Sequence, residues 1–547
     1  MAGARRKTGL ADLLTWITAG ALAIDLLMIA GLLALVATRG ASAFWPLPVV
    51  AFELADGTRV LGEIHDRQHI PDPATGAPTE ATRIRVRVGN RDLGGNDFRW
   101  IDEAAIARRS EPADAVLVER LEWGNFYGTP VALRAAGFET RDPAAIWAEY
   151  ALRHPLKVAL RERIRAIERG AIGDVNYELE QVRLAERHLE RTGGSLSESE
   201  RSARAAELAA RRSALEASYQ THLAELATLR EQLADGALVV ATADGTERAI
   251  PLGQIVRAVR PNTLGLGGEV GLYASRIREF VLGEPREANT EGGIFPALFG
   301  TVMMVVLMSF LVVPFGVVAA IYLREYAREG VLTRAVRIAV NNLAGVPSIV
   351  FGVFGLGFFV YGVGGTIDAL FFADSLPTPT FGTGGILWAS LTLALLTVPV
   401  VIVATEEGLA AVPQAVRQGS RALGATQFET LWRIVVPAAA PGMLTGLILA
   451  MARAAGEVAP LMIVGMVKLA PTLPIDSHPP FVHLERKFMH LGFHIYDVGF
   501  QSPNVEAAAP LVYATTALLI GIVVSLNLTA ILLRNRLRSR LVGRGGV

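Results

Sequence analysis

The chain has 547 residues, of which 51% are hydrophobic, and its 52 basic and 52 acidic side chains leave no formal net charge. A mean hydropathy of +0.38 combined with that many charges indicates a membrane protein whose charged residues are segregated from its apolar segments. The zero net charge argues against a nucleic-acid partner, and the absence of cysteine excludes disulfides and thiolate metal sites.

Six apolar segments are long enough to cross a bilayer, because a membrane helix needs about 20 apolar residues. They are residues 13–38, 294–322, 338–361, 386–405, 443–467 and 508–533. The first could instead be a signal peptide, since Ala41-Ser42-Ala43 is similar to a cleavage site. Its apolar core is longer than the roughly 7 to 15 residues of a signal peptide, so we interpret it as an uncleaved anchor.

Arginine and lysine residues predict the orientation of these spans. Basic residues precede the first span and follow the second and the last, whereas residues 362–385 contain none. The residues concerned are Arg5, Arg6 and Lys7, then Arg324, Arg328, Arg334 and Arg337, and finally Arg534, Arg536, Arg538 and Arg540. Under the positive-inside rule both termini are cytoplasmic, and residues 40–293 lie outside.

The charge-rich region between the first two spans contains strand patterns. Ile84, Val86 and Val88 alternate with arginines, as in a strand with one buried face. The tetrapeptide Ala-Asp-Gly-Thr occurs twice, at residues 55–58 and 243–246. Asp-Gly is a strong signal for a two-residue hairpin turn, although four common residues also recur by chance. We predict a small β domain made of residues 48–150 and 236–260.

Between the two β segments, residues 156–235 have the pattern of two amphipathic helices. Apolar residues recur at three-to-four spacing on both sides of Gly193-Gly194-Ser195, which breaks the helix, and Ser197 or Ser199 can cap the second helix. Two arms of about 35 residues, at 1.5 Å per residue, make an antiparallel coiled coil on the order of 50 Å long. Such a hairpin is either a solvated spacer or a docking arm for a partner.

The third span contains polar groups in an otherwise apolar segment. Asn341, Asn342 and Ser348 lie there, and Pro347 frees a backbone carbonyl. These groups are candidates for a substrate pathway. The alternative is close helix packing without substrate contact.

Residues 418–437 form a polar, glycine-containing segment between the fourth and fifth spans. Such a segment cannot lie in hydrocarbon, so we expect a loop at one membrane face. Gly424 permits a turn between two helical pieces that other residues resist. The positive-inside rule places this loop in the cytoplasm.

The fifth span carries two charges near the middle of the bilayer, Arg453 and Glu457. A charge at that depth costs roughly 2.5 to 3.5 kcal/mol, so it normally faces a bundle interior or an aqueous path. Their spacing of four residues places them on one helical face. Either they neutralise each other as a packing element, or Arg453 meets an oxyanion through its fork of donors. In the same span Gly442 and Gly446 have the spacing of a close helix contact.

The sequence predicts no metal site and no bound cofactor. Four of the nine histidines, His478, His483, His490 and His494, cluster before the last span, but their spacing matches no metal site, and solvated loop histidines are commoner. The phosphate-binding pattern GxxxxGK[ST] is missing, so this chain does not itself hydrolyse ATP through that motif. We expect a non-catalytic subunit.

The segment 418–437 reads QGSRALGATQFETLWRIVVP and resembles the EAA loop of ATP-binding-cassette importer permeases. Three further motifs strengthen this: GGIFPALFGT at 292–301, NNLAGVPSIVFG at 341–352 and ARAAGEVAPL at 452–461. Together they resemble the A-type permeases of phosphate-specific transport (Pst) importers. The resemblance covers about residues 284–533 and the first span.

This resemblance implies a mainly α-helical type I permease of six transmembrane helices with an external insert. It divides the chain into residues 1–39 with the first span, the insert 40–283, a core 284–533 with the loop at 406–440, and a basic tail 534–547. The loop residues that would couple to an ATPase are Gln418, Gly419, Ser420, Gly424, Ala425 and Pro437. The family usually has glutamate where this chain has Gln418, which puts a salt bridge to the ATPase in doubt.

The implied partners are a homologous second permease, two copies of a cytoplasmic ATPase that binds ATP and magnesium, and a periplasmic phosphate-binding protein. The implied location is the bacterial inner membrane. One alternative is a permease for another oxyanion, molybdate or sulfate. A second is a membrane-anchored scaffold or sensor that uses the external coiled coil.

Overall fold

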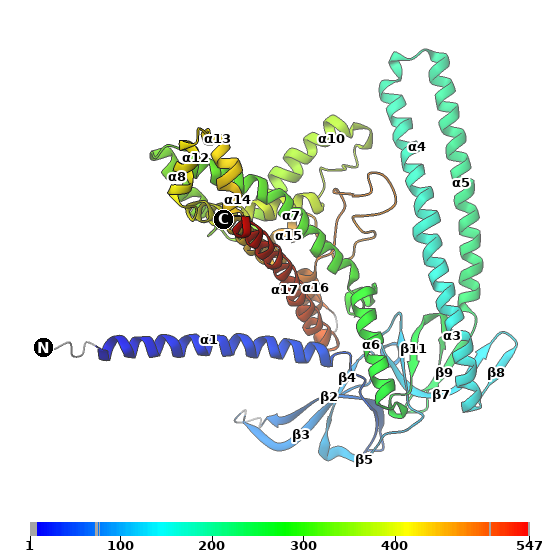
Figure 1. The fold of residues 1–547 in the computed structure, drawn as a ribbon. Coiled ribbons are helices and arrows are strands. Elements are labelled where there is room, and N and C mark those ends of the chain that lie inside the picture. The colour runs from blue at the N-terminus through cyan, green and yellow to red at the C-terminus, as the bar shows by residue number, and fades with distance from the viewer. Residues whose placement is uncertain (1–7, 72–74, 76, 503–504, 545–547) are drawn as a thin grey trace.

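The computed structural model describes residues 8–71, 75, 77–502 and 505–544. Figure 1 shows three parts: a bundle of long helices, a pair of β sheets beyond one end of it, and a helical hairpin that grows from the sheets. We call the end of the bundle next to the sheets the sheet end, and the opposite end the far end. Helix α1 (Thr8–Ser42) leans away from the bundle and meets α17 (Val505–Arg544) near Gly40.

Within the described residues six helices are long and apolar enough to cross a membrane, as the sequence predicts. They are Leu13–Ser42, Phe295–Tyr326, Ser348–Phe371, Ile386–Ala410, Gln427–Gly456 and Val505–Arg536. In the bundle these comprise α7 (Phe295–Ile321) with a π-helical end (Tyr322–Tyr326), α9 (Ser348–Phe354) to α10 (Gly365–Phe371) through π-helical Gly355–Gly364, α11 (Ile386–Ala410), α14 (Val436–Gly456) and α17. Arg5, Arg6 and Lys7, used to predict orientation, lie outside the described residues.

The bundle has one main apolar core, made where α7, α11 and α14 cross. Met304, Leu393 and Ala450 are fully buried in it. Small residues bring α11 and α14 together: a Cβ on Gly442 would lie 2.6 Å from the Cα of Gly408, and one on Gly446 would lie 2.6 Å from the Cβ of Ala404. The close helix contact predicted for these two glycines is therefore confirmed.

The third span differs from its predicted bounds of 338–361. A separate helix, α8 (Val331–Leu343), ends before Gly345, and the membrane helix begins only after Pro347. Proline disfavours a helical conformation in the residue before it, so the chain cannot continue as one helix through this point. The prediction that Asn341 and Asn342 lie in the third span is wrong, because both belong to α8, and Pro347 precedes the first residue of α9.

The fifth span is also displaced from the predicted 443–467. Helix α14 ends at Gly456, and a short helix, α15 (Ala459–Val464), follows with Pro460 in its first turn. Gly456 and Pro460 together interrupt the helix, and an average of hydropathy over many residues does not detect such an interruption. The long loop 465–490 and α16 (Leu491–Tyr496), with its π-helical extension Asp497–Gln501, then lead to α17.

The β region consists of two main antiparallel sheets. The first has the strand order β4-β3-β2-β1-β5 and the second has β10-β9-β7-β6-β11, with β8 paired to β7. The first is built from β1 (Val49–Leu54), β2 (Arg59–Pro71), β3 (Pro78–Arg87), β4 (Phe98–Asp102) and β5 (Ile106–Ser110), with α2 (Arg91–Gly94) before β4. The second is built from β6 (Val116–Arg120), β7 (Phe126–Ala135), β8 (Phe138–Thr140), β9 (Ala237–Ala241), β10 (Glu247–Pro251) and β11 (Ile255–Val259). A small pair, β12 (Pro285–Arg286) and β13 (Glu291–Gly292), precedes α7.

Both predicted strand signals are confirmed. Ile84 and Val86 are buried in the core of the first sheet, and the guanidinium of Arg83, on the other face of β3, lies over the ring of Trp100. Gly57 and Gly245 adopt φ of 84° and 88°, which is why Asp-Gly forms the turns from β1 to β2 and from β9 to β10.

The two sheets share one topology. If the strands of each are numbered along the chain, leaving β8 aside, both have the order fourth, third, second, first, fifth, and in both a single 3₁₀ turn joins the fourth strand to the fifth. The hairpin is inserted between the second and third strands of the second sheet. Its two ends meet, since Arg134 pairs with Ala237 and the amide of Ala136 donates to Asp235 over 3.0 Å.

The inserted helices are α3 (Pro143–Ala166), a π-helical segment (Ile167–Ala171), α4 (Ile172–Thr192) and α5 (Glu198–Ala234). Ser197 forms the predicted cap, with its hydroxyl accepting from the amide of Glu200. Leu226 and Leu229 of α5 are buried against α3 near the base of the hairpin. Helix α3 begins at Pro143 rather than near Pro155, where the sequence analysis placed the junction.

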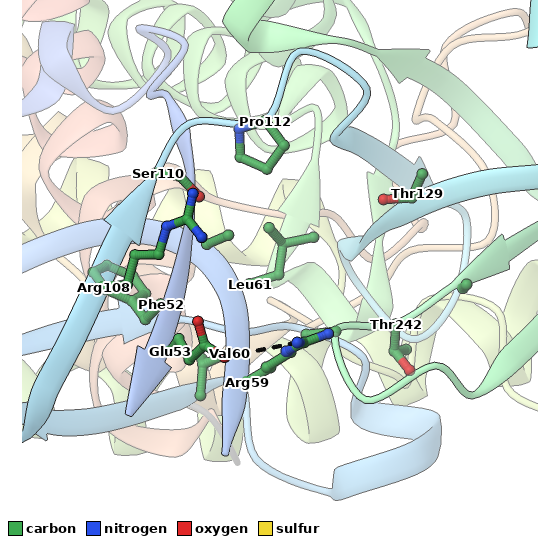
Figure 2. A pocket seen from close by; sticks show the side chains of 13 residues that line it. Phe52, Glu53, Arg59, Val60, Leu61, Arg108, Ser110, Pro112, Thr129 and Thr242 are labelled. Atoms are coloured by element: carbon green, nitrogen blue, oxygen red, sulfur yellow. Dashed lines mark ion pairs between the residues drawn. The ribbon is translucent and has the colours of Figure 1, made fainter. Parts of the chain in front are cut away.

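A groove of about 390 Å³ separates the two sheets (Figure 2). Arg108 and Ser110 of β5 line one side, and Thr129 and Thr242 line the other. Arg59 of β2 forms an ion pair with Glu53 at 3.6 Å. The groove lies in the β region, away from the bundle.

Candidate functional site

The polar segment 418–437 is a helix-turn-helix at the far end of the bundle (Figure 1). Helix α12 (Gln414–Ala422) is followed by a turn, by α13 (Gln427–Thr430) and by a π-helical segment (Leu431–Val435) that leads into α14. Gly424 has φ of +87° in the turn, and no atom lies within 4 Å of where its Cβ would be. The turn therefore requires glycine for its backbone conformation and not for lack of space.

Hydrogen bonds within the segment fix its two halves relative to each other. The hydroxyls of Ser420 and Thr430 lie 2.9 Å apart and are buried. Thr426 begins α13 as a capping box with Glu429, each bonding the backbone of the other. We call residues 414–435 the coupling segment.

The coupling segment is held to the bundle by a partly buried ion pair. Arg417 of α12 bonds Glu325, next to the end of α7, and it also donates to the carbonyl of Leu409 over 2.5 Å. Gln427 donates to the carbonyl of Glu325 over 2.9 Å. The segment is thus bonded both to the π-helical end of α7 and to α11. Sequence reasoning missed this contact because 92 residues separate the pair.

Large apolar side chains of the coupling segment face solvent. Leu423 is 91% exposed and Phe428 is 62% exposed, and Trp432 is exposed beside Phe428. Exposed apolar groups that cluster on one surface are typical of a protein interface. Their presence in an otherwise polar segment was a signal that the sequence analysis did not use.

The predicted loop residues divide between the surface and the inside of the segment. Gln418, Gly419 and Gly424 are exposed, whereas Ser420 is buried. Ala425 and Pro437 are half-buried, with Pro437 in the first turn of α14.

Arg453 and Glu457 form an ion pair of 3.5 Å at the end of α14. The neighbouring Ala454 and Ala455 are fully buried in the bundle core, but the side chains of Arg453 and Glu457 are 33% and 21% exposed. Glu457 has an extended conformation and ends the helix. The fifth span ends at Gly456, so Arg453 lies in its last turn and Glu457 just beyond it, not near the middle of the span as predicted. A charge pair on a face that this chain leaves partly open either lines a pathway or faces another subunit.

The other pathway candidates lie on α8 and α9. Asn341 and Asn342 are exposed on α8, and Ser348 is the first residue of α9. Among the described residues no hydrogen bond or ion pair connects them to Arg453 or Glu457. Apolar neighbours of these residues, Leu343 and Phe351 on one side and Ala454 and Ala455 on the other, nevertheless pack in the same core.

Of the histidines before the last span, His478 and His483 have carboxylate partners. His483 lies 2.9 Å from Asp476 and 3.1 Å from Glu485, and burial lowers the pKa of His490 to about 4. In the part of the chain that the structure describes, no three histidine, aspartate or glutamate side chains are arranged to hold a metal ion.

Residues 312–542 match the family model "Binding-protein-dependent transport system inner membrane component". Over 240 residues the chain is 30% identical to "Probable ABC transporter permease protein YqgI" of Bacillus subtilis, which covers 42% of this chain and 75% of that protein. Over 173 residues it is 39% identical to "Phosphate transport system permease protein PstA 1" of Mycobacterium tuberculosis, which covers 31% of this chain and 51% of that protein. Over 189 residues it is 32% identical to "Probable phosphate transport system permease protein PstA" of Methanocaldococcus jannaschii, which covers 34% of this chain and 60% of that protein. The chain thus spans about half the length of the first of the phosphate permeases.

Proposed function

Because this chain belongs to the family of binding-protein-dependent transport system inner membrane components, we propose that it is a permease subunit of an ATP-driven importer of inorganic phosphate. The observation that supports phosphate as the substrate is the 39% identity to a phosphate transport permease. It is a multi-pass membrane protein, and its relatives are permeases rather than enzymes.

The proposed orientation has both termini and the coupling segment in the cytoplasm. Arg324, Arg328, Arg334 and Arg337 lie at or beside the far end of the bundle, near the coupling segment, which supports this orientation under the positive-inside rule. The sheets and the hairpin are then periplasmic, and the membrane is the bacterial inner membrane.

The proposed partners are a second, homologous permease, two copies of an ATPase with ATP and magnesium, and a periplasmic phosphate-binding protein. The ATPase would seat on Leu423, Phe428 and Trp432. Its closure would move the coupling segment, and Arg417 would pass that movement to Glu325 and the spans.

Uptake of labelled phosphate tests the substrate. A strain lacking this chain should lose high-affinity uptake, and the chain supplied in trans should restore it. Excess molybdate or sulfate should not compete. Unchanged phosphate uptake in the deletion strain, with loss of molybdate or sulfate uptake, would favour the alternative oxyanion importer instead.

Leu423→Asp should abolish binding of the ATPase, because it places a carboxylate where the most exposed apolar side chain of the coupling segment would be buried. Co-purification of the ATPase from detergent-solubilised membranes measures this. Leu370→Asp is the matched control, since Leu370 is also exposed but belongs to α10, which lies apart from α12 and α13 (Figure 1). Retention of the ATPase by Leu423→Asp would show that the interface lies elsewhere.

A further inference from the structure

Helix α4 of the hairpin lies against two separate loops of the bundle. Loop A is residues 372–385, between the third and fourth spans, and loop B is residues 465–490, between α15 and α16. In Figure 1 α4 is the hairpin helix nearer to the bundle, and α5 lies on its far side. The contacts of α4 with both loops are side-chain contacts from its outward-facing surface.

At loop A, three residues near the tip of the hairpin contact Asp374 and Leu376. Arg191 donates to Asp374 over 2.8 and 3.3 Å, and His188 lies 3.0 Å from the same carboxylate. Arg187 bonds the carbonyl of Leu376. The guanidinium of Arg191 lowers the pKa of the Asp374 carboxyl below its ordinary value, so this aspartate is charged at neutral pH.

At loop B, the contacts come from residues nearer the base of the hairpin. Asp174 lies 2.9 Å from Nε2 of His478. The rings of Tyr177 and His478 are 4.4 Å apart, and the Tyr177 hydroxyl donates to the carbonyl of Pro479 over 3.2 Å. Below this, Arg169 pairs with Glu284, shortly before α7, so the base of the arm is fixed as well.

These contacts make α4 a rigid rod across two loops that belong to different spans. From Asp174 to Arg191 the helix measures about 25 Å at 1.5 Å per residue. Asp174, His188 and Arg191 are each more than half exposed. Exposed ion pairs contribute at most about 1 kcal/mol each, so the contact at loop A orders the arm without making it permanent.

We infer that α4 is a releasable strap, which bridges loops A and B in this conformation and lets go of loop A when the sheet end opens. The inference rests on the proposed function, because a transporter must alternate between openings at its two ends. A rigid helix fixed at its base and at loop B cannot follow loop A if the spacing of the loops changes. The contact at the tip is the one that must break.

The absence of cysteine allows a direct test. Arg191→Cys and Asp374→Cys, introduced together in the full chain, are joined in membranes by a short reducible thiol-specific linker. Phosphate uptake should fall at least tenfold on linking and return on reduction. Glu178→Cys with Arg211→Cys is the matched control, because these exposed residues are paired within the hairpin itself at 3.2 Å. Linking that pair should leave uptake unchanged.

Full phosphate uptake by the protein linked between residues 191 and 374 would overturn the proposal that α4 must release loop A. If the cysteine-free parent takes up no phosphate, the proposed substrate is wrong, and linking yield in membranes containing the whole transporter is measured instead. A yield that falls when ATP is added supports release of the arm from loop A. An unchanged yield overturns it.

Discussion

Gly424→Val should abolish transport while leaving the protein in the membrane. Gly424 adopts φ of +87°, a conformation that a β-branched residue resists at a cost of about 1 to 3 kcal/mol. The turn would relax by moving α12 relative to α13, since the space around Gly424 is open and no clash prevents movement. The apolar surface offered to the ATPase would then be split. We expect phosphate uptake to fall at least tenfold at normal abundance, measured with labelled phosphate and by immunoblot of membranes.

Two control variants separate backbone conformation from surface chemistry. Gly424→Asn should retain most uptake, because asparagine enters the left-handed region several times more readily than other residues. Gly419→Ala should be neutral, since Gly419 is helical and exposed with open space around it. Normal uptake by Gly424→Val would contradict the role of this turn in coupling.

Replacing both Arg453 and Glu457 by leucine should give an assembled but inactive permease. Removing one partner of this partly buried 3.5 Å pair leaves the other charge unpaired, whereas removing both does not, so the double variant is the one expected to fold. If Arg453 binds the oxyanion, uptake is lost with its guanidinium. We expect a fall of at least tenfold in the double variant, at an abundance and ATPase occupancy equal to those of the unmodified protein.

The exchanged pair Arg453→Glu with Glu457→Arg distinguishes pathway from packing. It keeps the ion pair and the net charge but moves the guanidinium from the end of α14 to the extended residue after it. A packing role predicts that uptake survives both the exchange and the double leucine variant. A pathway role predicts that uptake is lost in both.

The sequence predicts features that depend on near neighbours. The glycine turn at 424, the cap at Ser197 and the alternation around Ile84 each follow from a few adjacent residues, and each is present. The number of spans follows from apolar length alone. For the contact between Gly442 and Gly408, the spacing of small residues in the sequence predicts that α14 makes a close helix contact. It does not predict that α11 is the partner helix.

Helix boundaries inside apolar sequence were not predictable from hydropathy. The window 338–361 joined the end of α8 to the start of the third span, because Val340 and Leu343 are apolar although α8 is a separate helix. That error placed Asn341 and Asn342 among the pathway residues. Pro347 and Gly456 were the residues that marked the true ends.

Contacts between distant positions lay beyond the sequence analysis altogether. The pairing of Arg417 with Glu325 and the hold of α4 on Asp374 join residues 92 and 183 positions apart. Nothing in the local pattern of either partner indicates the other. The common strand order of the two sheets was hidden as well, because the two Ala-Asp-Gly-Thr turns occupy different places in it: one follows the first strand of its sheet and the other follows the third.

The hairpin occupies the place of an ordinary turn between two paired strands, and that makes it exchangeable. Because Arg134 and Ala237 are partners across the ladder, the hydrogen-bonded register of the second sheet is set without reference to what lies between them. An arm of another length or surface could be spliced in beyond the start of α3, whose Ile146 and Tyr150 are part of the apolar core of the second sheet and have to stay. In the first sheet the corresponding link between β2 and β3 is only residues 72–77. The two sheets, which share one strand order, thus have equivalent links between their second and third strands. In this chain only the link of the second sheet carries a helical hairpin.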